Sequence, residues 1–138
     1  MAWKRGEIHK VILMGLDGEP YTAGALTGTV TANELIRELV YIKSDGTFAQ
    51  ADATDNSKPA IGVIVAKPTS TTAVIKLFGK VGGYTGLTRG ALQYLSETLG
   101  ALTESAPAGS NKIVQPVGYA ISTTQVLFNI VPQWTVNP

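Results

Sequence analysis

The chain has 138 residues, a formal net charge of +1, only 15% charged residues and no cysteine. This length suits one domain, 1–138, which is large enough to bury a core without covalent cross-links. The absence of cysteine excludes disulfides and thiolate chemistry and is typical of a protein that folds in a reducing cytoplasm. The low charge excludes the broad basic face that binds nucleic acid through its phosphates.

The first segment, residues 1–10, is predicted to be an arm outside the folded body. It combines an aromatic side chain, two cations, an isoleucine and the only histidine of the chain, at Trp3, Lys4, Arg5, Ile8 and His9. A tryptophan in an arm gains little unless it docks on another surface. We therefore expect these residues to bind a partner, with the alternative that Trp3 folds back on its own domain.

An apolar run, 11–14, follows the arm and could begin a signal peptide, but residues 15–19 end it too soon. The longest apolar stretch elsewhere, 60–66, is about a third of the roughly 20 residues needed to cross a bilayer. The sequence therefore predicts neither export nor a membrane partner.

The rest of the chain has the pattern of an all-β protein. Short runs rich in β-branched residues are bounded by Gly, Pro, Asn and Asp about every ten residues, as in a small barrel or sandwich. Strands are predicted at 8–14, 28–31, 38–43, 47–51, 60–66, 72–78, 80–84, 91–96, 100–103, 116–122 and 125–131. The clearest turn is Ser44-Asp45-Gly46, because Asp-Gly tolerates the positive φ of a tight hairpin.

Residues 33–40 match two patterns. Leu35 and Leu39 are four residues apart and Asn33 is a good capping residue, which favours a short amphipathic helix. However, Leu35-Ile36-Arg37 matches the later segment Leu87-Thr88-Arg89, which Gly90 follows, and glycine is unsuited to a helix. We therefore expect a turn that leads into a strand.

One order of signals occurs twice along the chain. Each occurrence contains the same four elements in the same order: a strand with a tyrosine, a glycine turn, a strand with a glycine and a Ser-Thr-Thr turn. The matched tyrosines, Tyr41 and Tyr94, are 53 residues apart, and the matched glycines, Gly62 and Gly118, are 56 apart (94 − 41 and 118 − 62). The nearly constant offset predicts a body, 30–131, built from two pseudo-repeated β units. Its second glycine turn is Thr98-Leu99-Gly100.

Two polar loops, 52–58 and 103–112, occupy equivalent places in the two units. The tail, 132–138, lacks periodicity and is predicted to be a second extended arm. Trp134 in this tail has two alternative roles: it closes the end of its own domain, or it anchors an interface, where tryptophan is enriched.

Residues suited to catalysis or metal binding are scarce. One histidine, no cysteine and no nucleophile motif leave no basis for a catalytic triad, and Asp52 and Asp55 lack the spacing of a calcium loop. The matched and turn glycines are assigned structural roles, in turns and in close strand packing; they are Gly46, Gly62, Gly90 and Gly118. We expect no enzyme activity, no cofactor and no metal.

A family resemblance rests on the order of short motifs. In the first unit these are Val40-Tyr41-Ile42, Asp45-Gly46-Thr47 and residues 60–63; in the second they are residues 79–81, 86–90, 94–96, 100–102 and 114–120. This order is similar to that of tailed-bacteriophage virion proteins, the capsid decoration proteins above all. The resemblance covers residues 30–131 and departs from the pattern at Glu38, where a glycine often precedes the strand.

The resemblance implies a small β-rich protein that forms homotrimers on the capsid surface of the virion and clamps neighbouring coat subunits. Its partners would be the phage major capsid protein and copies of itself. Such a protein stabilises the lattice by mass action, because it binds assembled coat and not the free subunit. The alternative is a head-fibre or tail-fibre domain whose loops, 52–58 and 103–112, recognise a host receptor. Those loops carry no aromatic residue, which would be unusual for a sugar site.

Overall fold

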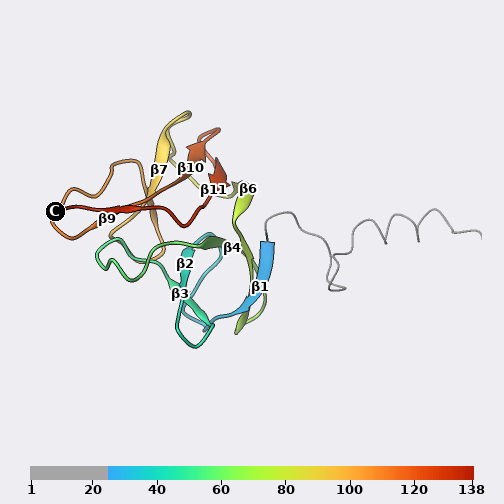
Figure 1. Ribbon diagram of the computed structural model, residues 1–138. Coiled ribbons are helices and arrows are strands. Elements are labelled where there is room, and N and C mark those ends of the chain that lie inside the picture. Colours follow the sequence, from blue (N-terminus) through green and yellow to red (C-terminus); the bar gives the residue numbers. More distant parts are fainter. Residues whose placement is uncertain (1–24) are drawn as a thin grey trace, which may run out of the picture.

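The computed structural model describes residues 25–138, which form two five-stranded antiparallel sheets and one two-stranded sheet, as in a small β-sandwich (Figure 1). The predicted all-β class is confirmed, and residues 25–138 contain no helix, so none that could cross a membrane. The expected strand 8–14 lies outside the described residues, as do Trp3, Lys4, Arg5, Ile8 and His9.

The first sheet takes its strands from the first half of the chain. They are β1 (Ala25–Thr29), β2 (Leu39–Ile42), β3 (Phe48–Gln50), β4 (Gly62–Thr69) and β5 (Thr72–Lys76). Their order across the sheet is β1-β5-β4-β2-β3. The edges are therefore β1 and the short β3.

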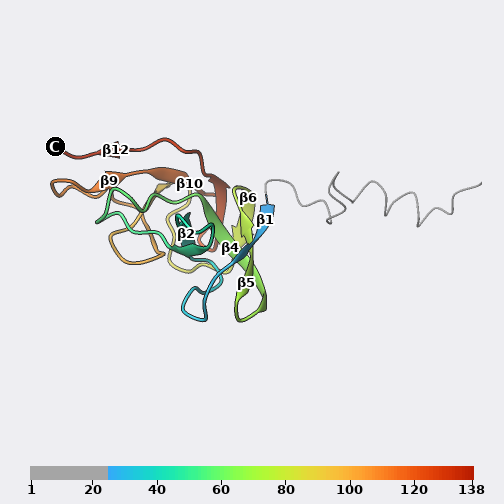
Figure 2. The same ribbon diagram turned by 60° about the horizontal axis from the view of Figure 1, so that its bottom comes forward.

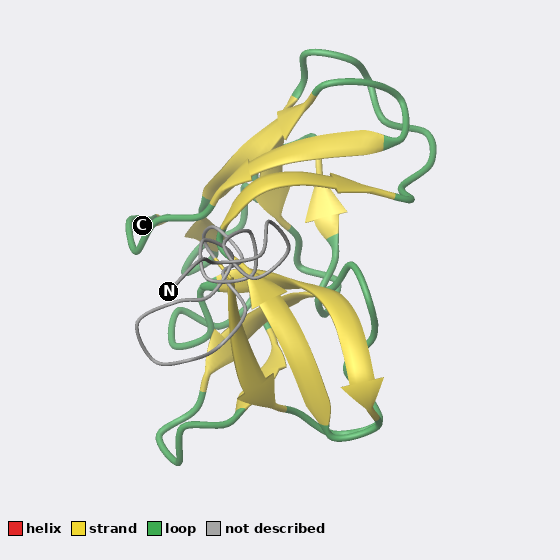
Figure 3. Cartoon of the chain, turned by 90° about the vertical axis from the view of Figure 1, so that its right-hand side faces the viewer, coloured by secondary structure: helices red, strands yellow, loops and turns green. Residues whose placement is uncertain are grey.

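The second sheet takes its strands from the rest of the chain. They are β6 (Phe78–Gly82), β7 (Leu92–Leu95), β8 (Leu102–Thr103), β10 (Pro116–Ala120) and β11 (Gln125–Asn129), in the order β6-β11-β10-β7-β8. The remaining strands, β9 (Ile113–Val114) and β12 (Thr135–Val136), pair with each other. Figure 3 shows the two large sheets as separate curved layers.

The two large sheets share one strand order: β1 to β5 take the same relative places as β6, β7, β8, β10 and β11. Their registers also correspond. Val40 lies opposite Gly62 in the first sheet, and Gln93 lies opposite Gly118 in the second. These pairs keep the spacings seen in the sequence, 53 and 56 residues (93 − 40 and 118 − 62).

Register partners define one equivalent row of side chains across each sheet, because directly opposite residues share a face. We call these rows the outer rows. In the first sheet the row is Ala25, Lys76, Val63 and Leu39, and in the second it is Lys80, Leu127, Tyr119 and Leu92.

The two glycine turns also correspond. Gly46 has φ +85° and Gly100 has φ +71°, in the left-handed region where glycine carries no Cβ penalty. In the first turn the Lys43 N–H donates to the Thr47 carbonyl (2.7 Å), and in the second the Ser96 N–H donates to the Ala101 carbonyl (3.0 Å). The second turn is one residue longer.

Residues 33–40 form turns and then enter β2, as predicted, and not a helix. The Glu38 N–H donates to the Leu35 carbonyl (3.2 Å), and the Ala91 N–H donates to the Thr88 carbonyl (3.0 Å) in the second unit. These bonds match Leu35 with Thr88 and not with Leu87, so the sequence alignment of this segment was off by one residue. Arg37, with φ +75°, then corresponds to Gly90, with φ +84°.

The core shows how the sheets stack. One buried cluster lies on the inner face of the first sheet and contains Val30, Val40, Phe48, Ile64, Ala73 and Ile75. A larger cluster joins the outer row of the first sheet, through Leu39 and Val63, to Val81, Val126 and Phe128 on the inner face of the second. The first sheet is therefore buried on both faces, which explains the continuous apolar run at the start of β4.

Candidate partner-binding surface

The outer row of the second sheet is exposed at Tyr119 and Leu127, whereas its counterpart in the first sheet is buried on β2 and β4 and partly exposed at Ala25 and Lys76. Tyr119 is 55% and Leu127 is 41% exposed, while Leu39 and Val63 of the first row are fully buried. Leu92 is half-buried at the other end of the exposed row. The second sheet therefore presents an apolar stripe to solvent.

Phe78 extends this stripe along the edge strand. It is 54% exposed and lies opposite Asn129, on the same face as Lys80 two residues further along β6. We call the whole surface the outer face; it comprises Phe78, Lys80, Leu92, Tyr119, Leu127 and Asn129. Lys80 is its only charged residue.

A groove of about 820 Å³ continues from the outer face at Asn129. Its walls come from β9 to β12 and are mostly apolar: Val114, Pro116, Asn129, Val131, Pro132, Gln133, Trp134 and Thr135. The Trp134 side chain is 38% exposed. A large aromatic surface in a groove is a typical anchor point for a partner.

The tail is held against the chain's own loop and is not a free arm (Figure 2). Thr135 lies opposite Val114 in the β9–β12 pair. The Asn137 N–H donates to the Lys112 carbonyl (2.9 Å), and Asn137 Nδ2 donates to the carbonyls of Pro107 (2.7 Å) and Gly109 (3.0 Å). Trp134 therefore directly precedes a backbone segment, 135–137, that is hydrogen-bonded to residues 107–114.

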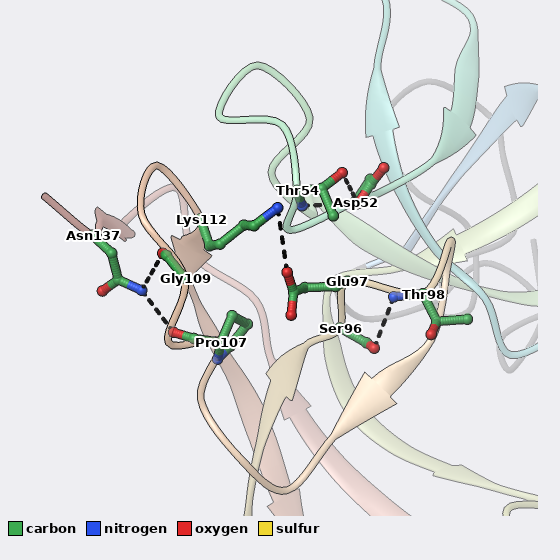
Figure 4. Close-up of polar contacts among 9 residues, drawn as sticks. All are labelled: Asp52, Thr54, Ser96, Glu97, Thr98, Pro107, Gly109, Lys112 and Asn137. Atoms are coloured by element: carbon green, nitrogen blue, oxygen red, sulfur yellow. Dashed lines mark hydrogen bonds and ion pairs between the residues drawn. The ribbon is translucent and has the colours of Figure 1, made fainter.

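The two polar loops meet at the same end of the molecule as the tail (Figure 4). The Ile113 N–H donates to the Ala53 carbonyl (2.8 Å), and Lys112 Nζ lies 3.4 Å from Glu97 Oε1. This ion pair is partly exposed and contributes little stability. Together, the Ala53–Ile113 bond and this ion pair bring loop 52–58, the second glycine turn and the end of loop 103–112 to one end of the molecule.

The carboxylates of the first loop close local turns. Asp52 Oδ1 accepts from the Thr54 N–H (2.8 Å), and Asp55 Oδ1 accepts from the Ser57 hydroxyl (2.6 Å) and N–H (2.8 Å). The hydroxyl bond, followed by the amide bond, lowers the pKa of Asp55. These carboxylates are thus used in Asx turns, and residues 25–138 contain no group of three or more His, Cys, Asp or Glu that could hold a metal ion.

A second hollow, of about 470 Å³, lies beside the turns that precede β2 and β7, and its polar groups bond one another. Glu104 Oε2 accepts hydrogen bonds from the Thr88 N–H (2.8 Å) and from Gln93 Nε2 (3.1 Å). These bonds lower the pKa of Glu104, and the bond from the Thr88 backbone has the larger effect. Burial raises the pKa of Tyr84, whose hydroxyl donates to the Arg37 carbonyl (3.2 Å). Within residues 25–138, Gln93 Oε1 is the one buried side-chain N or O atom without a hydrogen-bond partner.

The glycines singled out in the sequence fall into two groups. Gly46 and Gly90 have positive φ in turns. Gly62 and Gly118 lie in strands, where a Cβ would come within 2.3 Å of Ile75 Cγ2 and of the Leu127 carbonyl oxygen, respectively. All four positions therefore concern backbone geometry and not a binding surface.

Of the predicted interface residues, Trp134 alone lies within the described chain. Sequence reasoning missed Phe78, Tyr119 and Leu127. One signal was present: in β11, Val126 and Phe128 alternate with Leu127, so both faces of this strand carry apolar side chains. Such a strand has its second face either buried or available for contact.

Comparison with known proteins gives no assignment: no family model matches this chain, and no curated protein matches it.

Proposed function

We propose that this chain is a structural virion protein that binds the outer surface of a phage capsid and stabilises the coat lattice as a symmetric homo-oligomer, a trimer. The observation that carries a binding role is the groove at Trp134, an exposed indole in an apolar groove whose walls are fixed by the β9–β12 pair. We infer the location on the capsid from the sequence resemblance over residues 30–131.

The groove suits this role because its anchor needs little ordering before it binds. The backbone that follows Trp134 is already hydrogen-bonded through β12 and Asn137, so binding does not bear the full entropy cost of fixing it. Many symmetric copies acting at once would stabilise the lattice through binding alone.

The test is binding to expanded capsids by a Trp134→Ala variant. Removing a central aromatic anchor is expected to weaken binding by about 2 kcal/mol, roughly 30-fold, while the folded protein stays intact. The matched control is Leu35→Ala, since Leu35 is exposed but lies on a turn of the first unit, away from the groove. Unchanged affinity of the Trp134 variant would contradict an interface at the groove.

Deletion of residues 1–7 tests the arm separately. We expect weaker capsid binding and an unchanged fold, because Trp3, Lys4 and Arg5 would lose their contacts with the coat. If affinity stays the same, the arm serves its own domain. Electron microscopy of particles with and without the protein then locates it, because a decoration protein adds density on the capsid and a fibre domain adds it on an appendage.

One observation favours the alternative, a receptor-binding domain of a head or tail fibre. The loops 52–58 and 103–112 meet at one end, and the tail that carries Trp134 is bonded to the second loop. Trp134 is therefore three residues before Asn137, which bonds the second loop, although the two loops themselves contain no aromatic residue. Binding of Trp134→Ala to host cells, compared with binding to capsids, separates the two functions.

A further inference from the structure

The stacking of the two sheets leaves one face without a cover. The outer row of the first sheet lies under the inner face of the second, and its Leu39 and Val63 are fully buried. The equivalent row of the second sheet has no sheet above it within residues 25–138. Tyr119 and Leu127 there are roughly half exposed; the same strand order and register match Tyr119 with the fully buried Val63 and Leu127 with the partly buried Lys76.

The composition of the outer face allows it to meet a like surface. Its apolar residues are Phe78, Leu92, Tyr119 and Leu127, and its single charge, Lys80, lies on the edge strand. No carboxylate stands in its rows. Two such faces would bring apolar side chains together without placing like charges at the centre.

The edge of this sheet is less suited to pairing than its face. The Ile130 N–H donates to the Leu77 carbonyl (2.9 Å), and the alternation of an antiparallel ladder then directs the N–H and C=O of Lys80 away from β11. Lys76 Nζ donates to this Lys80 carbonyl (3.3 Å). A lysine along an open edge opposes the addition of another strand, so contact through the face is favoured over sheet extension.

We propose that the outer face of the second sheet is where neighbouring copies of this chain contact each other. The occupant follows from the fold: this chain already covers one such face with a sheet of its own sequence, and the equivalent face remains open. This deepens the oligomer of the proposed function by naming its surface, but it does not require a capsid. The faces would converge around the symmetry axis, with Tyr119 and Leu127 at the centre.

The size of the face predicts a weak pairwise contact. Four strands about 4.8 Å apart and five residues of about 3.4 Å give a face of roughly 20 by 17 Å. That is well below the roughly 800 Å² per partner of a standard stable interface. Association in solution should therefore depend on concentration.

The experiment uses the absence of cysteine from the chain. Asn129→Cys places one thiol on the outer face, and Ser70→Cys places one on the β4–β5 turn of the first sheet, which is exposed. The rate of maleimide labelling is measured in the full chain from micromolar to millimolar protein, together with sedimentation. We expect labelling at position 129 to slow severalfold as concentration rises and labelling at position 70 to stay constant.

A charge on the face should remove the effect. Leu127→Lys, in the Asn129→Cys background, is expected to restore fast labelling at all concentrations and to give a monomer. The matched control, Ile42→Lys, replaces a strand residue of the first sheet that is 52% exposed and should leave the concentration dependence unchanged. Circular dichroism checks that both variants fold.

Three outcomes would overturn the proposal. Labelling that is fast at every concentration, with a monomer in sedimentation, means that no copy covers the face. Slow labelling that is independent of concentration means that a segment of the same chain covers the face. Residues 1–24, which lie outside the described structure, would then be the candidate segment. Equal effects of Leu127→Lys and Ile42→Lys mean that another surface makes the contact. A monomer in solution would count against the homo-oligomer of the proposed function, but not against the capsid binding that Trp134→Ala tests, so the two failures remain distinguishable.

Discussion

The two large sheets have the same strand order and corresponding registers, yet one is buried on both faces and the other on one. At one equivalent position the first sheet has Val63 and the second has Tyr119. Valine fits a closed, water-free contact, whereas tyrosine combines apolar surface with a hydroxyl that can remain hydrated. The backbone arrangement therefore does not decide which side of a strand belongs to the core; the segment that stacks on that side does.

The turns before β2 and β7 differ in a second way. The amide of Leu35 donates to Glu38 Oε1 (2.6 Å), within the same turn, whereas the equivalent amide of Thr88 donates to Glu104 Oε2 (2.8 Å), beyond the end of β8. The equivalent backbone N–H groups of Leu35 and Thr88 are thus hydrogen-bonded by a carboxylate of the same turn in one unit and by a carboxylate far along the chain in the other. This explains why Glu38 can stand where the second unit has Ala91.

The largest expected effect comes from truncating one leucine in each outer row. Leu39→Ala is expected to lower the free energy of unfolding by about 3 kcal/mol, because it leaves a cavity in a fully buried contact. Leu92→Ala removes the same atoms from the equivalent, half-buried position and should cost about 1 kcal/mol. Urea denaturation of both variants measures the difference. Equal losses would show that the outer row of the second sheet is covered in solution.

An intermediate effect is expected at the two strand glycines. A Cβ at Gly118 would lie 2.3 Å from the Leu127 carbonyl oxygen, a backbone atom that cannot move without breaking the ladder. A Cβ at Gly62 would lie 2.3 Å from Ile75 Cγ2, a side-chain atom that can move only if the buried Ile75 changes its rotamer. We expect Gly118→Ala to cost about 2.5 kcal/mol and Gly62→Ala about 1.5 kcal/mol. Thermal unfolding of the two variants checks the order, and a larger loss at Gly62 would contradict it.

The smallest effect concerns pH and the carboxylate at the second turn. Hydrogen bonds from Thr88 and Gln93 lower the pKa of Glu104 below its ordinary value of 4.5. The folded state therefore gains stability above that pH and loses it as pH falls through the lowered pKa. Glu104→Gln should be less stable than the parent chain at neutral pH, and the difference should shrink in acid. Unfolding curves between neutral and acid pH test this, and a difference that does not change with pH would argue against the assignment.

The strand pattern allowed most of the fold to be predicted. Among the described residues, ten of the strands correspond to predicted runs, with ends displaced by up to three residues. The two that were missed, β9 and β12, have two residues each. Alternation cannot be recognised over so short a segment. Next to β12, Asn137 donates to the carbonyls of Pro107 and Gly109, which lie 30 and 28 residues earlier, and no local pattern indicates such a contact.

The all-β class, the glycine turns and the order of signals that occurs twice follow from the amino-acid sequence alone, because these depend on local preferences for φ and on period-2 alternation. The sequence also places a tryptophan near the end of the chain. Long-range packing fixes the tail against loop 103–112, buries Leu39 and Val63 in the core, and leaves Tyr119 and Leu127 facing solvent. No local pattern predicts this, because a strand with apolar residues on both faces can have either face buried, and the face that becomes buried depends on which sheet stacks on it.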